Sequence, residues 1–258
     1  MNADRSALFR GRHFADDVIV LCVRWYLRYS LSYRDLAEMM VERHLSVDPS
    51  TIWRWVQRYA PELNERIRHE LKPTNGSWRT DETYVRVAGR WTYLYRAVDS
   101  AGATIDFFLS ETRDVFAAGA FFRKALAAPS HPRPRVINVD GNPSYPRVVD
   151  ELKRTHTLGQ RCRCRVVPYL NNIVEQDHRA IKRRIQASLG FRSFAGAERT
   201  IQSYEAMHMI RKGQLRWLAK GDIAEQVRFV KYIFALSAGS ADSSTAAPRL
   251  PAPICNRA

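Results

Sequence analysis

Residues 78–109 read WRTDETYVRVAGRWTYLYRAVDSAGATIDFFL. The stretch is rich in aromatic and β-branched residues, which favour strands. Two turn sequences, Ala88-Gly89 and Ser100-Ala101-Gly102, divide it into the runs 78–87, 91–98 and 104–109. Short strands joined by short turns run in opposite directions. The stretch therefore predicts an antiparallel meander of three strands, and with it a protein built around a sheet.

Helices and strands alternate after this meander. Helical spacing of apolar residues predicts helices over 114–128, 145–155 and 171–189, and short apolar runs predict strands over 135–139 and 162–167. Three antiparallel strands followed by helix, strand, helix, strand and helix is the element order of the RNase H-like α/β fold. We therefore expect an RNase H-like catalytic core, a mixed sheet with flanking helices, over residues 73–190.

The chain beyond this core divides into two further segments. Apolar periodicity predicts another helical stretch over 194–218, so 191–236 is expected to be a C-terminal helical segment. From Ser237 the chain consists largely of Ser, Ala and Pro without periodicity. Such a composition favours disorder, and 237–258 is predicted to be a disordered tail.

The first 72 residues predict three helices. One is expected over 14–30, and a second begins after Ser32 and stops near His44. Asp48 can cap a third helix, with Pro49 at its first position. A turn of about five residues between the last two helices is typical of a helix-turn-helix unit, in which the last helix reads DNA. Segment 1–72 is expected to be this DNA-binding domain, although an ordinary three-helix bundle fits the same pattern.

The third helix is expected to have a buried side and an outward side. Its apolar residues Ile52, Trp55, Val56 and Tyr59 share the side that faces the core. The other side carries polar and basic residues that can contact bases and phosphates. These expected DNA-binding residues are Ser50, Thr51, Arg54, Gln57 and Arg58.

The charge indicates a polyanionic partner. The 258 residues include 41 Lys and Arg against 26 Asp and Glu, a net charge of +15, and residues 141–220 alone carry 16 basic and 6 acidic side chains. With 45% hydrophobic residues the chain can bury a core, which excludes a wholly disordered or fibrous protein. Its apolar run near the start, 18–23, is too short to span a membrane. We expect a cytoplasmic, nucleoid-associated protein without a membrane partner.

Three acidic residues could form a metal site. Asp81 lies within the first predicted strand, Asp140 directly follows the fourth, and Glu175 lies one turn into the helix over 171–189. Mg²⁺ prefers carboxylate ligands, and two such ions can hold both oxygens of a phosphoryl transfer. Because side chains alternate along a strand, only one of Asp81 and Glu82 is expected to point into a single site. The pattern leaves that choice open, and Asp99 and Asp106 at strand ends remain nominal alternatives.

Three segments around these acids resemble the catalytic blocks of bacterial DDE transposases of insertion sequence family six. They read WRTDETY at 78–84, NVDG at 138–141 and NNIVEQDHRAIKRR at 171–184. The similarity also takes in FRGRHF at 9–14, and 34 residues separate Asp140 from Glu175, the spacing that family shows. Seven positions after Glu175 comes Lys182, which the resemblance implies contacts DNA beside the carboxylates.

The resemblance implies a transposase that binds insertion-sequence ends and catalyses DNA cleavage and strand transfer. Asp81, Asp140 and Glu175 would be the metal ligands and, with Lys182, the catalytic residues. Two Mg²⁺ ions, which Mn²⁺ can replace, are the expected cofactors. The expected partners are double-stranded DNA, both element ends and target, and at least a second copy of the chain. A regulator that binds DNA through the helix-turn-helix on an inactive RNase H-like scaffold is the alternative.

The helix over 171–189 also makes sense without the family. Val174, His178, Ile181 and Ile185 form a stripe that is expected to be buried, with His178 as a packed or hydrogen-bonded neighbour rather than a metal ligand. Glu175, Arg179 and Lys182 share the border between this stripe and the open site. Arg179, Lys182 and Arg183 are therefore predicted to contact DNA. Arg183 and Arg184 are expected to contact phosphates or solvent.

Overall fold

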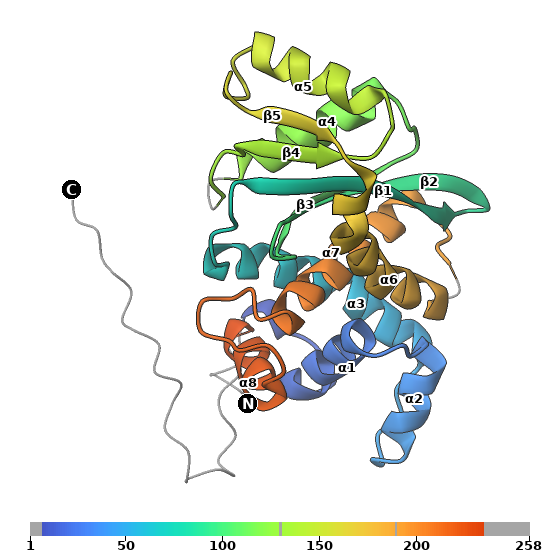
Figure 1. Cartoon of the computed structure of the whole chain (residues 1–258). Helices are drawn as coiled ribbons and strands as arrows, with labels where there is room; N and C mark the ends of the chain where they lie inside the picture. The colour runs from blue at the N-terminus through green and yellow to red at the C-terminus, as the bar shows by residue number, and fades with distance from the viewer. Residues whose placement is uncertain (1–6, 129–130, 189, 235–258) are drawn as a thin grey trace.

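The computed structural model describes residues 7–128, 131–188 and 190–234, and its centre is a five-stranded mixed sheet (Figure 1). The strands lie in the order β3-β2-β1-β4-β5. Their bounds are Ser77–Val87 for β1, Arg90–Asp99 for β2, Thr104–Ser110 for β3, Val136–Val139 for β4 and Arg163–Val166 for β5. The predicted disordered tail lies outside the described residues.

The predicted meander is confirmed. β1 and β2 pair antiparallel from Trp78 opposite Asp99 to Val87 opposite Arg90, and β3 continues the meander beside β2. Ala88 and Gly89 form the first turn with φ angles of 49° and 79°. A two-residue hairpin turn needs positive φ at both positions to match the twist of its strands. This turn therefore sets the register of the β1–β2 pair.

The two remaining strands run parallel to β1. Ser77–Arg79 of β1 pair with Val136–Asn138 of β4, and β4 pairs along its length with β5. Beyond Arg79, β1 pairs with no further strand on its β4 side, and only a single bridge joins Val87, at its far end, to Phe191 in the described chain. The sheet therefore opens where β4 ends, a point at which open α/β sheets place their functional sites.

Helices cover both faces of the sheet (Figure 1). α4 (Val115–Ala127) and α5 (Ser144–Arg154) pack with one set of alternating sheet residues, among them Trp78 and Ile105. α6 (Asn172–Ala187) and α7 (Phe194–Arg211) cover the opposite face, which supplies Leu94 and Phe107. This arrangement, in the predicted element order, confirms the mixed RNase H-like sheet with flanking helices.

The three N-terminal helices are α1 (Asp16–Arg28), α2 (Tyr33–Val41) and α3 (Pro49–Ile67). Asp48 caps α3 by accepting a hydrogen bond of 2.7 Å from the Ser50 amide, as predicted. The predicted inward set of α3, Ile52, Trp55, Val56 and Tyr59, is buried. These helices share one continuous hydrophobic core with α6, α7, α8 and a face of the sheet. Segments 1–72 and 191–236 therefore pack together around α3 and α7.

The helical stretch predicted over 194–218 is wrong at its end, because α7 stops at Arg211. Gly213 adopts a φ of +70°, and a Cβ at this position would lie 2.6 Å from the Lys220 amide nitrogen. The close approach of the backbone forces the chain to turn here. A separate helix, α8 (Ile223–Ile233), follows with Asp222 as its N-cap. None of the helices in the described ranges is both long and apolar enough to cross a membrane.

A buried ion network fastens α6 and α7 to the sheet. The Arg96 guanidinium on β2 is fully buried, 2.6 Å from an Asp177 oxygen on α6 and 2.5 Å from a Glu205 oxygen on α7. His208 Nε2 and Lys212 Nζ lie 2.6 and 3.1 Å from the other Asp177 oxygen, Oδ1. Burial raises the pKa of Asp177, but the charge of Arg96 and the contacts of His208 and Lys212 outweigh it and hold the pKa below its usual value. Asp177 is therefore a charged group inside the protein.

We predict that Arg96→Met lowers the free energy of unfolding by about 3–5 kcal/mol, because it leaves the Glu205 carboxylate buried without its cation. Urea unfolding followed by circular dichroism measures the change. Arg90→Met, at an exposed position at the start of the same strand, is the matched control and should change stability by no more than about 0.5 kcal/mol. Equal small effects of both substitutions would show that the network does not stabilise the fold.

Candidate active site

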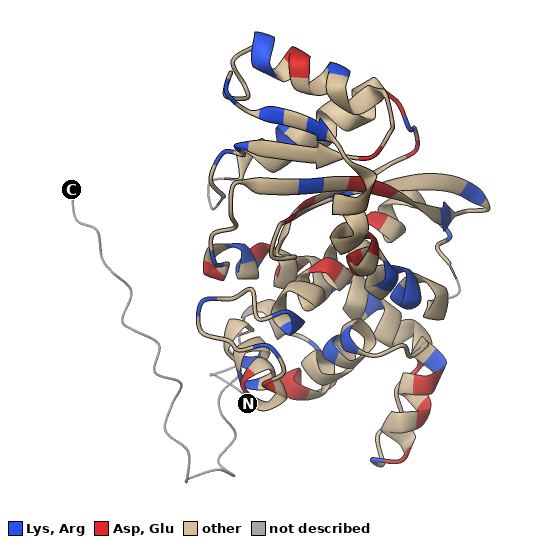
Figure 2. Cartoon of the chain, in the orientation of Figure 1, with Lys and Arg blue, Asp and Glu red and all other residues tan. Residues whose placement is uncertain are grey.

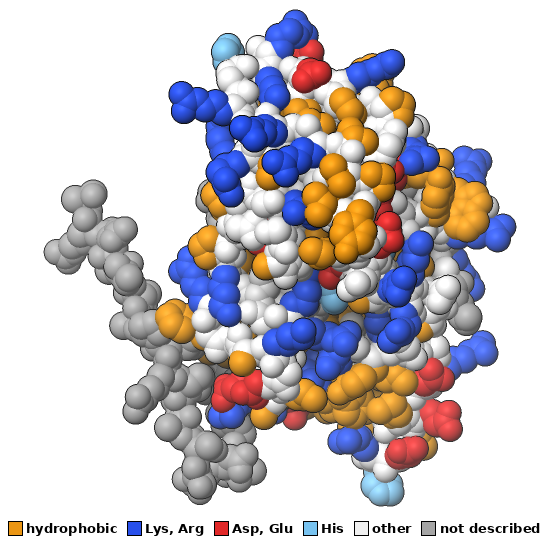
Figure 3. Space-filling view, in the orientation of Figure 1, with side chains coloured by type: hydrophobic (Ala, Val, Ile, Leu, Met, Phe, Trp, Pro, Cys, Tyr) orange, Lys and Arg blue, Asp and Glu red, His pale blue; other side chains and the backbone are white. Residues whose placement is uncertain are grey.

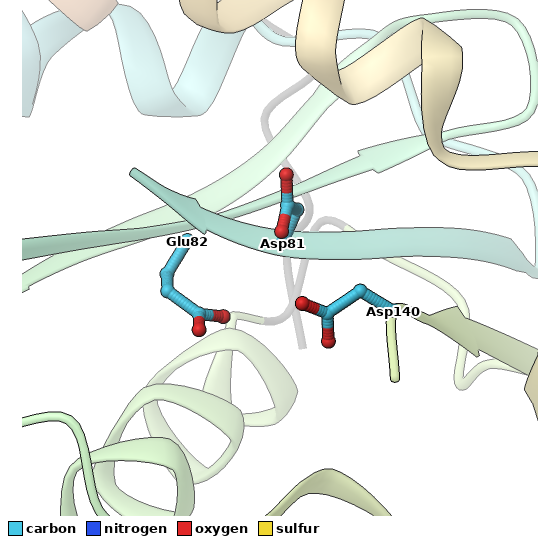
Figure 4. Close-up of side chains that lie close together, drawn as sticks. All are labelled: Asp81, Glu82 and Asp140. Carbon is cyan, nitrogen blue, oxygen red and sulfur yellow. The ribbon is translucent and has the colours of Figure 1, made fainter. Parts of the chain in front are cut away.

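Two of the predicted metal ligands meet where β1 and β4 diverge. Asp81 lies two residues beyond the last β1–β4 pair, and Asp140 directly follows the end of β4. Oxygen atoms of Asp81, Glu82 and Asp140 all lie within 4.8 Å of one another (Figure 4). The diverging strands therefore bring together carboxylates that are far apart in the sequence.

The prediction that only one of Asp81 and Glu82 can reach this site is wrong. The two side chains do leave β1 in different directions, as strand alternation requires (Figure 4). However, the longer Glu82 side chain extends beneath β1 toward Asp140, while Asp81 stays beside the strand. Because β4 stops pairing with β1 at Arg79, no strand lies beside Asp81 and Glu82 on this side in the described chain, and both carboxylates can face the same opening.

Glu82 is held by three neighbours. It is 8% exposed, accepts hydrogen bonds from the Tyr145 hydroxyl and, at 3.1 Å, from the Asn142 amide, and pairs with Arg113. Arg113 also lies 3.9 Å from an Asp140 oxygen. The Glu82 charge is therefore already balanced within the protein, and the carboxylate is fixed in orientation.

Asp81 and Asp140 are not balanced in this way. Burial raises the pKa of Asp81 to about 7, and the charges of Glu82, Asp140 and Glu175 add to the effect. Burial and the Glu82 charge also raise the pKa of Asp140. The hydrogen bond from the Asn142 backbone N–H and the charge of Arg113 lower this pKa, but by less. These raised pKa values mean that the two carboxylates bind either a proton or a metal cation more readily than an exposed carboxylate does. A cluster of carboxylate oxygens lacking charge compensation fits a hard divalent ion such as Mg²⁺.

His178 lies against this cluster from α6. Its Nδ1 is 3.8 Å from an Asp81 oxygen, beyond hydrogen-bonding distance, and the residue is 4% exposed. Burial, with the charge of Arg96, lowers its pKa well below the usual value, so the imidazole is neutral. Val174 and Ile181 are buried with it, which confirms most of the predicted stripe; Ile185 is half-buried.

Glu175 lies in the first turn of α6, outside the group of three carboxylates. It is exposed and has no hydrogen bond or ion pair among the described residues. Its charge adds to the rise in the pKa of Asp81, less than burial and the charges of Glu82 and Asp140 do. The structure thus brings Asp81 and Asp140 together with Glu82 and leaves the Glu175 carboxylate outside this cluster, without a side-chain partner in the described chain.

Two buried asparagines fix where α6 begins. The Asn138 side chain on β4 donates a 2.7 Å hydrogen bond to the Asn171 side chain, which itself donates to the Thr80 carbonyl at 3.1 Å. This chain of bonds joins β4, β1 and the residue before α6. Sequence reasoning missed both residues, although a polar Asn138 between Ile137 and Val139 in an apolar strand was a signal. Arg113, Asn142 and Tyr145 gave no such signal, since only the fold brings them to Glu82.

The other candidates fall into two groups. Asp99 accepts hydrogen bonds from the backbone amides of its own turn and of Asn75, and Asp106 pairs with Arg68 and Lys124, so both acids stabilise the fold.

The predicted DNA-binding residues of α6 are exposed: Arg179, Lys182 and Arg183. In α3, Ser50, Arg54 and Arg58 are exposed and Thr51 is half-buried, whereas Gln57 donates a 3.0 Å hydrogen bond to Thr200 of α7.

Comparison with known proteins gives a consistent result. Residues 75–214 match the family model described as a DDE domain. A transposase for the insertion sequence-like element IS431mec of Staphylococcus aureus is 38% identical over 210 residues, which cover 81% of this chain and 91% of the relative. The transposase for insertion sequence element IS257 in transposon Tn4003, from the same species, has the same identity and coverage.

Among solved structures, the dimeric form of the HTLV-2 integrase catalytic core domain with magnesium is similar at 16% identity. The similarity has a TM-score of 0.41 and covers 56% of this chain and 94% of that chain.

The raised pKa of Asp81 predicts how stability depends on pH in protein kept metal-free with a chelator. A carboxyl whose pKa is about 7 when folded and about 4 when unfolded binds more protons in the folded state between those values. The free energy of unfolding therefore falls as pH rises from about 4 to about 7. Asp81→Asn removes this loss, and we expect it to be more stable than wild type at pH 8 by about 1–3 kcal/mol.

Urea unfolding of both proteins at pH 8 and pH 4.5 tests this, and the advantage should shrink at the lower pH. Asp150→Asn, at an exposed position on α5, is the control and should shift stability equally at both pH values. An Asp81→Asn protein that is less stable than wild type at pH 8 would contradict the charge imbalance described here.

Proposed function

This chain belongs to the DDE transposases of insertion sequence family six, and we propose that it binds the two ends of an insertion sequence and joins them to target DNA. The observation that carries the proposal is the meeting of Asp81 and Asp140 at the diverging strand ends. Glu175 is exposed in the first turn of α6. No comparable observation favours a regulator on an inactive scaffold, because the acids of a catalytic site are all present.

Asp81, Asp140 and Glu175 are the proposed ligands of two Mg²⁺ ions, which Mn²⁺ can replace. Bound divalent ions would activate the attacking oxygen and stabilise the leaving oxygen of a phosphodiester. The fit rests on the two aspartates, whose pKa values are raised by burial and by the neighbouring carboxylates, so that a bound cation would stabilise their charged forms. Cleavage by water and joining by the freed 3′-hydroxyl then use the same carboxylates, without a covalent enzyme intermediate.

Glu175 is preferred over Glu82 as the third ligand for a physical reason. Glu82 is already engaged by Arg113, Tyr145 and Asn142, so a metal would have to compete with three partners. Glu175 has none in the described chain. Glu82 is instead a positioning residue that holds Arg113 near Asp140.

The surface around the carboxylates would hold DNA. Lys182, with Arg179 and Arg183, is exposed on α6, the helix that carries Glu175 in its first turn. Lys182 would hold a phosphate close to the reacting one and so orient the strand. Joining two ends in one event needs at least two copies of the chain, so we infer a homodimer or higher assembly on the nucleoid DNA.

The exposed residues of α3 would recognise the element ends. Arg54 and Arg58, with the exposed Trp53 and with Arg199 of α7, line an open hollow of about 510 Å³. Arg54 and Ser50 lie at helical spacing on the outward side of α3. Gln57 is the exception in the predicted set, because its side chain binds Thr200. A helix with this outward face fits the reading helix of a helix-turn-helix.

We predict that Asp81→Asn, Asp140→Asn and Glu175→Gln each lower strand transfer of labelled end DNA in Mg²⁺ by about 100-fold or more, because the amides remove ligand charge. Binding to the ends should persist in gel shifts. Glu82→Gln should lose only about 10–100-fold, with part of the activity restored by higher Mg²⁺, as expected for a residue that orients a ligand. If the Glu175→Gln variant joined ends at the wild-type rate, Glu175 would not be a metal ligand, and Glu82 would be the third ligand instead.

We predict that Arg54→Ala weakens discrimination between element ends and random duplex by about 1–3 kcal/mol, since alanine cannot bind the base that the arginine reads. Competition gel shifts measure the discrimination, and joining of pre-nicked ends at saturating protein should change less. Arg147→Ala, exposed on α5, is the control with the same loss of charge. An unchanged preference for ends in the Arg54 variant would remove this residue from end recognition.

A further inference from the structure

Arg184 on α6 is a buried guanidinium without hydrogen bonds. The residue is 5% exposed, and none of its three side-chain nitrogens has a partner among the described residues. The guanidinium carbon lies 5.0 Å from the ring centre of Tyr204 on α7 and 6.0 Å from that of Tyr26 on α1. The sequence predicted that Arg184 contacts phosphates or solvent. The exposure that this prediction assumed is wrong, because the rings of Tyr204 and Tyr26 cover the Arg184 side chain.

More arginines gather around it from two other helices. We call this group the arginine junction: Arg24 and Arg28 of α1, Arg183 and Arg184 of α6, and Arg211 of α7. Arg24 is 7% exposed, and the Nε of Arg28 is buried without a hydrogen bond. Figure 2 shows basic segments on α1 and α6 where the two helices approach each other.

The positive charges of the junction are not balanced by carboxylates. Burial lowers the pKa of Arg211, and the charges of Arg28, Arg184 and Arg183 lower it further. Burial and then the Arg28 charge also lower the pKa of Arg184, against partial support from the Tyr204 and Tyr26 hydroxyls. Within the described chain none of the five arginines forms an ion pair, in contrast to Arg96 with its two carboxylates.

A buried cation without a counter-ion is costly, and the cost is relieved when an anion binds nearby. The anion can reach the junction through Arg183, which is exposed, and through Arg28 and Arg211, which are half-buried. Figure 3 shows Lys and Arg side chains in a belt across this face, between the sheet and the N-terminal helices.

The distance between the arginine junction and the start of α6 matches the length of a short DNA duplex. Arg183 and Glu175 are on the same helix, and eight residues at 1.5 Å each separate them by about 12 Å along its axis and by about 80° around it. This span corresponds to roughly four base pairs of duplex DNA. One short duplex can therefore contact both.

We propose that the arginine junction is a binding site for the DNA phosphate backbone, independent of base sequence, that holds the duplex along α6. This proposal rests on the proposed function, because it takes DNA as the partner. Arg28, Arg183 and Arg211 contact the phosphates. The buried Arg184 does not contact them, but its positive charge attracts them. The site lies apart from the base-reading face of α3 and from the carboxylates.

The test uses the full chain, a random-sequence duplex and a chelator, so that neither end recognition nor metal chemistry contributes. Arg28→Gln/Arg211→Gln should lower affinity and reduce the slope of log K against log salt by about 1–2, at about 0.9 for each phosphate that the variant no longer neutralises. The control, Arg147→Gln/Arg161→Gln, removes two exposed charges on and after α5 and should keep the wild-type slope. A wild-type slope for the junction variant, or an equal loss in the control, would overturn the proposal.

Arg184→Met gives a second measurement that does not depend on the first variant. Replacing an unpaired buried charge with an apolar side chain of similar length should raise the midpoint of thermal unfolding, while random duplex should stabilise the variant less than it stabilises wild type. A lower midpoint together with an unchanged effect of duplex would assign Arg184 to packing alone and overturn its part in the site.

These results are separable from those for the proposed function. If the wild-type protein does not join ends, but the junction variant reduces the slope of log K against log salt, the proposed function is contradicted and the proposed backbone site is supported. If the wild-type protein joins ends and the junction variant keeps the wild-type slope, only the proposed backbone site is contradicted.

Discussion

The ion pairs of Arg96 hold the catalytic half of this protein together. A fully buried guanidinium on strand β2 binds Asp177 of α6 and Glu205 of α7, so the two helices can lie on the sheet in only one arrangement that satisfies all three charges. Asp177 is two residues after Glu175. The position of the exposed glutamate at the start of α6 therefore depends on ion pairs that are largely buried.

Two opposite electrostatic defects lie beside α6. In its first half, His178 lies 3.8 Å from Asp81 of β1, whose pKa burial and neighbouring carboxylates raise, so that its charged form is disfavoured. In its last turn, Arg184 is buried without a counter-ion in the described chain. Each defect costs folding free energy, and each is relieved by a component of a metal–DNA complex, cations at one place and phosphates at the other. Both indicate a fold that keeps charge unbalanced until its ligands arrive.

The N-terminal helices are continuous with this arrangement. α1 and α3 pack on α7 in one hydrophobic core, and the Gln57 side chain binds Thr200 across the α3–α7 contact. The helix proposed to read the element ends is thus packed directly on the helix that holds Glu205. A duplex bound by α3 would have a fixed position relative to the carboxylates, which is what cleavage at a defined phosphate needs.

The sequence alone determined the elements and much of the chemistry. Strand-forming runs separated by Ala88-Gly89 predicted the meander, and the order of the following elements predicted the RNase H-like sheet, because these signals depend on neighbouring residues. The catalytic blocks around Asp81, Asp140 and Glu175 identified the family. The end of α7 was missed, since Gly213 turns the chain only because the backbone at Lys220 lies against it.

Only the tertiary structure decided which charges meet. Whether Glu82 reaches Asp140 depends on where β4 stops pairing with β1, and whether Arg184 is exposed depends on rings from α1 and α7. A pattern of residues records the period of a helix or strand but not the side chains that other elements bring to it. Burial and long-range contacts, which set the pKa of Asp81 and bury Arg96, exist only once those elements have packed.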